Sequence, residues 1–250
     1  MSEHATHEHW DTSVWPLVIS VGILFALPLA FSFKFVYHSP IFAVLCLGLG
    51  VPMIVAGITG WTSEAIGEKG DFVGLSTPAM GWFILAEAMI FISFFCTYWY
   101  LRLVAPAWPP EGSVELPVLY PAIMTAVLVS SSFTIHIGEE KLESGDSGGF
   151  IKWLLITMVM GLIFLGMSIY EWNHLFHEGF VYSTNIFSTA FFSITGFHGA
   201  HVFIGLGIFL TMLLPALKGK INKGFVKSGS LYWHFVDIIW LFVVSQLYYW

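Results

Sequence analysis

Charged residues are scarce in this chain of 250 residues, where they make up only 10% of the sequence. An ordinary soluble domain contains about 25%. The nine Lys and Arg residues provide no basic patch for a phosphate backbone, so the sequence excludes a nucleic-acid partner. Because 57% of the residues are hydrophobic, the composition predicts a membrane protein.

Cysteine is almost absent as well. Cys46 and Cys96 both lie in apolar segments and form neither a Cys-x-x-Cys pair nor a disulfide framework. The sequence has no Cys-x-x-Cys-His motif for covalent haem and no cysteine spacing for copper or an iron–sulfur cluster. It also lacks the glycine-rich nucleotide-binding motifs and the Gly-x-Ser-x-Gly nucleophile motif. We therefore expect this chain to hold no metal, cofactor or redox centre of its own.

Seven apolar runs are long enough to cross a bilayer as helices, which takes about 20 residues each. They cover residues 14–31, 41–60, 80–104, 120–137, 150–171, 188–214 and 231–250. A polar tail over residues 1–13 precedes them. The sequence therefore predicts an all-α membrane protein with a single seven-helix transmembrane domain over residues 14–250.

Basic residues are distributed unevenly between the two sides that seven helices define. One side holds Lys69, Lys141, Lys152, Lys218, Lys220, Lys223 and Lys227, and the other holds Lys34 and Arg102. Since short cytoplasmic loops carry the excess of Lys and Arg, we predict that the N-terminus lies inside and the C-terminus outside. The loops are too short for an extramembrane catalytic domain, so the protein acts in the bilayer or through partners there.

Glu87 lies within the third apolar run, where an ionisable side chain usually has a partner or a function. Burial in the bilayer disfavours the charged form, so we expect Glu87 to be largely protonated at neutral pH and to face protein. It is either a proton-handling or reactive carboxyl, or a neutral acid that is hydrogen-bonded to a neighbouring helix. The sequence leaves both interpretations open.

His198 and His201 are three residues apart in the sixth run and therefore share a helix face. Gly199 and Gly205 beside them allow another helix to approach closely. Two imidazoles can ligate a metal, but a haem or copper site needs further ligands from other helices. Interhelical hydrogen bonding is the stronger interpretation.

Two further pairs lie near the ends of runs. Glu171 and His174 have the spacing of di-iron carboxylate sites, which need a second such motif and two more Glu residues. The sequence has one motif, so we expect a structural contact of Glu171 with a His or Arg. His234 and Asp237 share a face of the seventh helix. They form either a proton relay or a neutral hydrogen-bonded pair that joins this helix to the sixth.

Two late motifs resemble those of a known family. Residues 196–202 read Gly-Phe-His-Gly-Ala-His-Val and are followed by Gly205. Residues 232–237 read Tyr-Trp-His-Phe-Val-Asp and are followed by Ile-Ile-Trp-Leu-Phe. Both look like segments of cytochrome c oxidase subunit III, and the resemblance covers the chain almost end to end. It includes Trp15-Pro16-Leu17, Trp61, residues 83–95 around Glu87, Trp108-Pro109-Pro110 and Glu171.

This resemblance implies a subunit of a bacterial cytoplasmic or inner mitochondrial membrane, with two helices splayed from the other five and phospholipids in the cleft between them. Such a subunit docks on the haem- and copper-bearing subunit I, beside subunit II, of a proton-pumping oxidase in aerobic respiration. It stabilises subunit I and keeps proton uptake fast. By resemblance the buried polar positions that matter are Glu87, Glu171, His198, His201, His234 and Asp237. The lipid-binding candidates are Trp61 and Lys69.

Departures from the family pattern weaken the expectation that the cleft binds anionic lipid head groups. No Arg precedes Glu87 in residues 76–80, and Thr62, Ser63 and Gly67 stand where relatives often have basic residues. Electrostatic capture of anionic head groups depends on such cations.

Two other functions stay open from the sequence alone. Quinol oxidases and, more distantly, nitric oxide reductases have related subunits, which usually lack the first two helices that are present here. A proton-coupled transporter would use Glu87, His198 and Asp237 as a relay. Transporters often contain inverted repeats and broken helices, and this sequence shows neither.

Overall fold

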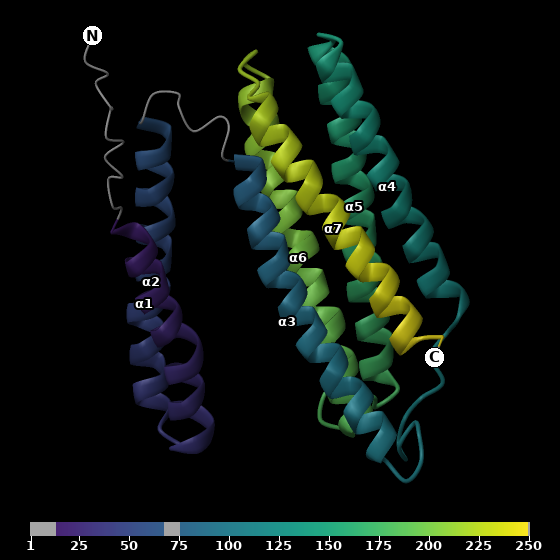
Figure 1. Cartoon of the computed structure of the whole chain (residues 1–250). Helices are drawn as coiled ribbons and strands as arrows, with labels where there is room; N and C mark the ends of the chain where they lie inside the picture. Colours follow the sequence, from purple (N-terminus) through teal and green to yellow (C-terminus); the bar gives the residue numbers. More distant parts are fainter. Residues whose placement is uncertain (1–13, 68–75, 250) are drawn as a thin grey trace, which may run out of the picture. The chain divides into compact units, whose positions relative to one another are not determined.

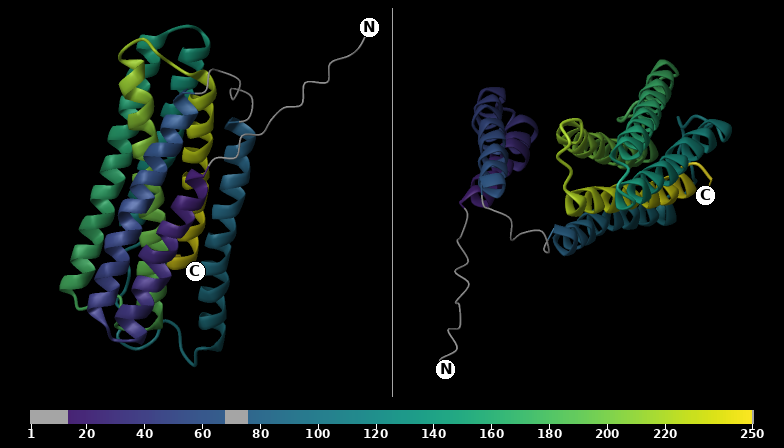
Figure 2. Two further views of the ribbon diagram at one scale, coloured as in Figure 1. Left: turned by 90° about the vertical axis from the view of Figure 1, so that its left-hand side faces the viewer. Right: turned by 90° about the horizontal axis from the view of Figure 1, so that it is seen from above.

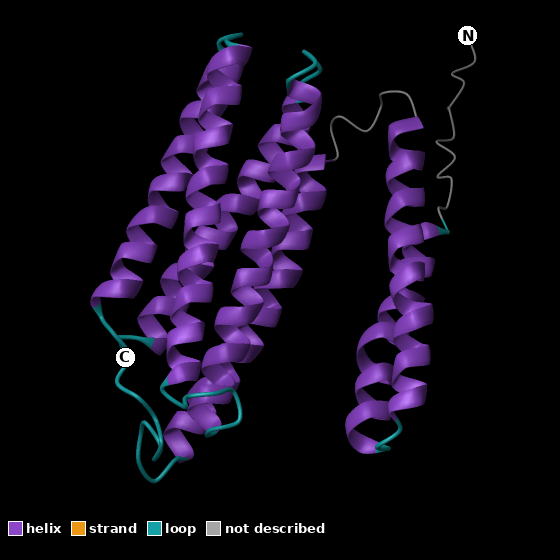
Figure 3. Cartoon of the chain, turned by 180° about the vertical axis from the view of Figure 1, so that it is seen from behind, coloured by secondary structure: helices purple, strands orange, loops and turns teal. Residues whose placement is uncertain are grey.

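The computed structural model describes residues 14–67 and 76–249, with side chains for residues 14–60 and 80–249. All regular structure in these ranges is helical (Figures 1 and 3). Seven helical segments are long and apolar enough to cross a membrane, which confirms the predicted fold class. The chain forms two compact units, Met1–Asp71 and Phe72–Trp250. The lipid-filled cleft expected between them depends on their relative placement and stays a prediction.

The first span changes its helical form midway. Helix α1 (Trp15–Leu24) continues through two π-helical segments, η1 (Phe25–Leu29) and η2 (Ser32–Val36). Pro28 lies inside η1. Since proline has no N–H and its ring collides with the carbonyl four residues back, it breaks regular α-helical bonding, and the wider π turns accommodate it. The span therefore runs past the predicted end at residue 31 and includes Lys34.

Helix α2 (Pro40–Gly67) packs along the first span through glycines. A Cβ atom at Gly50 would lie 2.6 Å from the carbonyl oxygen of Gly22, and one at Gly57 would lie 2.5 Å from the Ile19 side chain. Small residues at such positions let two helix backbones approach closely inside a bilayer. The two spans of the first unit are thus held together by close packing of their backbones at the glycines.

Within the described residues, the second unit contains the helices α3 (Ser76–Val104), α4 (Leu119–Glu143), α5 (Ser147–His177), α6 (Ile186–Ala216) and α7 (Lys223–Leu247). Side-chain caps fix three of their N-termini: Asp146 accepts from the N–H of Gly149, Asn185 forms a capping box with Ser188, and Asn222 accepts from the N–H of Phe225. Helices α4 and α5 extend beyond the predicted spans at their C-terminal ends, and α7 begins earlier. Hydropathy marks only the apolar part of a helix, whereas the polar ends continue past it.

Helix α7 lies beside α3, α4 and α6 (Figure 2). Its Trp233 side chain reaches α4, α5 and α6. The Trp233 side chain is fully buried, and its Nε1 donates to the Ser131 hydroxyl of α4 at 2.8 Å. A Cβ at Gly161 of α5 would lie 2.8 Å from the indole ring, and one at Gly205 of α6 would lie 2.7 Å from it. The two glycines therefore make the space that the indole fills.

Candidate functional site

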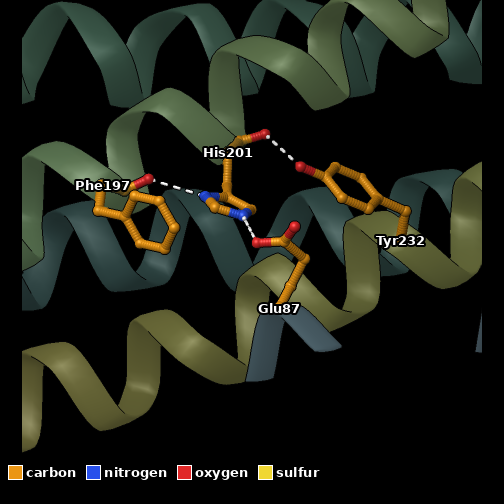
Figure 4. Close-up of polar contacts among 4 residues, drawn as sticks. All are labelled: Glu87, Phe197, His201 and Tyr232. Carbon is orange, nitrogen blue, oxygen red and sulfur yellow. Dashed lines mark hydrogen bonds and ion pairs between the residues drawn. The ribbon is translucent and has the colours of Figure 1, made fainter. Parts of the chain in front are cut away.

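Glu87 and His201 join α3 to α6 inside the second unit (Figure 4). The Oε2 atom of Glu87 lies 3.1 Å from Nε2 of His201. The other ring nitrogen, Nδ1, lies 2.8 Å from the carbonyl oxygen of Phe197, and the Tyr232 hydroxyl donates to the carbonyl oxygen of His201 at 3.2 Å. The contact therefore connects three helices, because Tyr232 belongs to α7.

The geometry of His201 defines what this contact can do chemically. Its Nδ1 faces a carbonyl oxygen, which only accepts, so Nδ1 carries a hydrogen. Its Nε2 then either accepts the proton of the Glu87 carboxyl or, as part of an imidazolium, donates to the carboxylate. In both arrangements a single proton lies between the two residues. The pair can therefore hold one proton, and the protonation of Glu87 itself stays a prediction.

Aromatic rings surround the His201 imidazole. The ring centroids of Phe91, Phe197, Tyr232 and Phe235 lie 4.6–6.4 Å from that of the imidazole. The His201 side chain is 6% exposed, whereas that of Glu87 is 19% exposed. The His201 end of the contact is therefore buried, whereas the Glu87 end lies nearer the surface of the unit.

His198 does not act together with His201, although both lie on the expected stretch of α6. Its ring is 1% exposed and packs against Phe164 and Trp240, with centroid distances of 5.7 Å and 5.1 Å. Neither ring nitrogen has a hydrogen-bond partner among the described residues. Over the same residues, no three His, Cys, Asp or Glu side chains gather in a metal-binding arrangement.

His234 and Asp237 are not hydrogen-bonded to each other, which corrects the expectation of a pair joining α7 to α6. The Nδ1 atom of His234 lies 3.0 Å from the Ser132 hydroxyl of α4. Asp237 is 5% exposed, and its carboxyl oxygens have no partner among the described residues. Residues three apart on a helix differ by about 60° in direction, since each residue turns it by about 100°. That difference sends His234 toward α4 and Asp237 into the core.

Glu171 binds Tyr248 instead of the expected His or Arg. Its carboxyl is buried, and Oε2 accepts a hydrogen bond from the Tyr248 hydroxyl at 2.7 Å. Burial, together with the nearby Glu171, raises the pKa of Tyr248 well above its usual value, so the phenol keeps its proton and remains the donor. His174 turns away and lies 3.3 Å from Glu178. The contact of Glu171 therefore ties the C-terminal end of α7 to α5.

Two lipid-binding candidates cannot be placed. The side chain of Trp61 and the whole of Lys69 lie outside the described residues. Their assignment therefore stays a prediction.

The sequence as a whole matches one family. The family model described as "Cytochrome c oxidase subunit III" matches residues 4–250. The chain belongs to the cytochrome c oxidase subunit III family. Curated relatives named "Cytochrome c oxidase subunit 3" include a protein of Synechocystis sp., 40% identical over 66% of this chain and 72% of its own length. The proteins of Loxodonta africana and Rattus norvegicus are 32% and 33% identical over 99% of this chain and 98% of their own lengths.

Sequence reasoning missed the partners of these subunit III residues. Ser132 and Tyr248 are the hydrogen-bond partners of two predicted residues, yet neither belongs to a recognisable motif. One signal was present: Ser131 and Ser132 are adjacent hydroxyls within an apolar run. Such hydroxyls commonly bond across helices in membranes, so they mark a contact face.

Proposed function

We propose that this chain is a non-catalytic subunit of a proton-pumping haem–copper terminal oxidase that transfers electrons from cytochrome c to oxygen. The observation that carries the proposal is the match to the subunit III family over nearly the whole chain. Relatives such as the Synechocystis protein are named as subunits of cytochrome c oxidase. The chain docks on subunit I beside subunit II, with its N-terminus on the inner side of the membrane and its C-terminus on the outer side.

Haem and copper belong to the partner subunits in this proposal. The sequence supports this division because it has no haem-attachment motif and no cysteine spacing for a metal cluster. Three ionisable residues within the spans serve as interhelical contacts: Glu87 binds His201, His234 binds Ser132, and Glu171 binds Tyr248. Bound phospholipid is the one non-protein component that we assign to this subunit.

The subunit stabilises subunit I and keeps its proton uptake fast. A rigid five-helix unit suits this role, since its contacts reach across all five helices and give a partner a fixed surface. Deleting the chain should leave the initial rate of oxygen reduction high while the oxidase inactivates faster during turnover and takes up protons more slowly. Equal inactivation kinetics with and without the chain would refute the stabilising role.

Purification in mild detergent tests the assignment itself. A tagged form of the full chain should bring down a partner that contains haem and copper and that oxidises reduced cytochrome c. Oxidation of a quinol in place of cytochrome c would move the subunit to a quinol oxidase. The presence of α1 and α2 argues against that alternative, because the quinol-oxidase relatives usually lack these helices. A protein that purified alone and moved protons across liposomes would refute the oxidase proposal.

A further inference from the structure

The first unit has an open apolar groove at the end where its two spans turn. The groove has a volume of about 840 Å³ and lies between the π-helical segments and the N-terminal part of α2. Its lining includes the small residues Ala26, Ala30 and Ala43, each less than one-tenth exposed, and the larger Phe31 and Leu47. Every residue that lines the groove belongs to the first compact unit.

The helical form of the first span explains why a groove exists here. Both η1 and η2 line it, as does Pro28. The wider π turns carry the span away from the regular α-helical path that it follows through Trp15–Leu24. Farther along the hairpin, Gly22 and Gly50 bring the two backbones together. The hairpin is therefore tightly packed at its glycines and hollowed beyond its proline.

Lys34 also lines the groove and gives it its charge. It is the single charged residue in the sequence from residue 14 to residue 60. The described side chains of the first unit thus supply no carboxylate to balance it. Lys34 lies near the end of the span, at the depth where a lysine places its apolar stem along protein and its ammonium among head groups.

We propose that this groove is a binding site for an anionic phospholipid, with an acyl chain along the apolar floor and the phosphate on Lys34. Two observations favour this occupant: the lining of the groove is mostly apolar, and its one cation has no counter-charge among the described side chains of residues 14–60. A phosphate supplies that charge and an acyl chain covers the floor. The site lies at the N-terminal end of α2, whereas Trp61 belongs to the C-terminal end of the same helix.

The groove should prefer anionic lipids because Lys34 carries a positive charge. A lysine near the membrane surface attracts an anionic lipid with an energy that corresponds to roughly a fivefold change in binding. Filling the groove should weaken the binding of anionic and zwitterionic lipids alike, because it removes the space for the acyl chain. Val44 lines the groove and is 66% exposed, so a larger side chain there fills the groove without disturbing the core.

Photo-crosslinking in membranes that contain the assembled complex tests the site. Phosphatidylglycerol and phosphatidylcholine, each with a photoreactive group in one acyl chain, are compared by mapping labelled peptides over residues 26–47. We expect Lys34→Gln to lower labelling by phosphatidylglycerol roughly fivefold and to leave phosphatidylcholine unchanged. Lys34→Arg should retain the wild-type pattern. Val44→Trp should lower labelling by both lipids, whereas Val55→Trp, on the same helix but outside the groove, should not.

Three results would overturn the proposal. The first is equal labelling by the two lipids in the wild-type protein, and the second is an unchanged preference in Lys34→Gln. The third is a cross-link from the groove to another polypeptide, which would show that a partner protein occupies it. Because Lys34 and Val44 are exposed, assembly of the variants should be normal, and co-purification of the complex checks this. Failure of the subunit assignment would appear as purification of the chain without partners, whereas failure of the lipid proposal would appear in the labelling pattern of residues 26–47.

Discussion

Replacing Gly205 by alanine tests whether the second unit is packed around Trp233. The added Cβ would lie 2.7 Å from the indole ring, closer than any unstrained contact between carbon atoms. The indole cannot retreat, because Gly161 of α5 lies against its other edge and its Nε1 is bonded to Ser131. Either the ring or the α6 backbone must therefore move.

Overpacking of this kind costs about 1–3 kcal/mol. In a domain of 150–250 residues each kcal/mol lowers the midpoint of thermal unfolding by about 2–4 °C, so we expect a decrease of roughly 2–12 °C. Gly207→Ala is the matched control, since a Cβ there meets no atom within 4 Å. It introduces the same methyl group on the same helix and should leave the midpoint nearly unchanged.

The assay is thermal unfolding of the purified complex, followed by the loss of helical circular dichroism and by haem absorbance of the partner. Adding Trp233→Leu to the Gly205→Ala variant should make the alanine less harmful, because the smaller side chain leaves room for it. Equal midpoints for the two glycine variants would refute the packing argument. So would strictly additive effects of Gly205→Ala and Trp233→Leu, since residues in contact should couple.

Three further changes test the polar contacts. Tyr248→Phe removes the donor to the buried Glu171 and should destabilise the complex by about 1–3 kcal/mol, measured by thermal unfolding. Ser132→Ala should cost less, about 0.6 kcal/mol, the average for a hydrogen bond between membrane helices. Glu87→Gln should keep thermal stability, because an amide can also donate to His201, but it should remove an infrared band of a protonated carboxyl. Glu87→Ala should assemble and then lose activity faster during turnover.

Controls separate these effects from general damage. Tyr249→Phe removes a hydroxyl that is bonded to the carbonyl of Val118 at a residue that is 51% exposed, so it should cost less than Tyr248→Phe. A larger loss in Tyr249→Phe would contradict the importance of burial. An infrared spectrum that lacks a protonated-carboxyl band in the wild-type protein would show that the shared proton belongs to His201. Unchanged inactivation in Glu87→Ala would leave Glu87 with a purely structural role.

The sequence predicted the seven spans and four of the buried polar residues, Glu171, His198, His201 and Asp237, because both are local properties. Glu87 and His234 are half-buried. Hydropathy over about 20 residues finds a span, and a charge inside a span is conspicuous. Helix ends were predicted less well: α7 begins at Lys223, ahead of the predicted residue 231, since its first turns are polar. The π turns around Pro28 also left no signal in hydropathy.

The sequence could not predict which residues form hydrogen bonds with the polar residues of the spans. The spacing of His234 and Asp237 fixes the angle between their side chains around the helix axis. Which neighbouring helix each side chain contacts depends on how the helices pack. His234 meets Ser132, 102 positions away, and Glu171 meets Tyr248, 77 positions away. No local pattern contains such separations, so the sequence indicated that these residues need partners without naming them.

The contact between Glu87 and His201 also has an electrical consequence. Moving one elementary charge across the whole membrane is worth about 2.3 kcal/mol per 100 mV, over a hydrocarbon core of about 30 Å. The two atoms that share the proton are 3.1 Å apart, so a proton passing between them crosses at most about a tenth of that thickness. A potential of about 100 mV therefore changes its energy by at most about 0.2 kcal/mol, well below thermal energy. The pair keeps the same proton arrangement whether or not the membrane is energised.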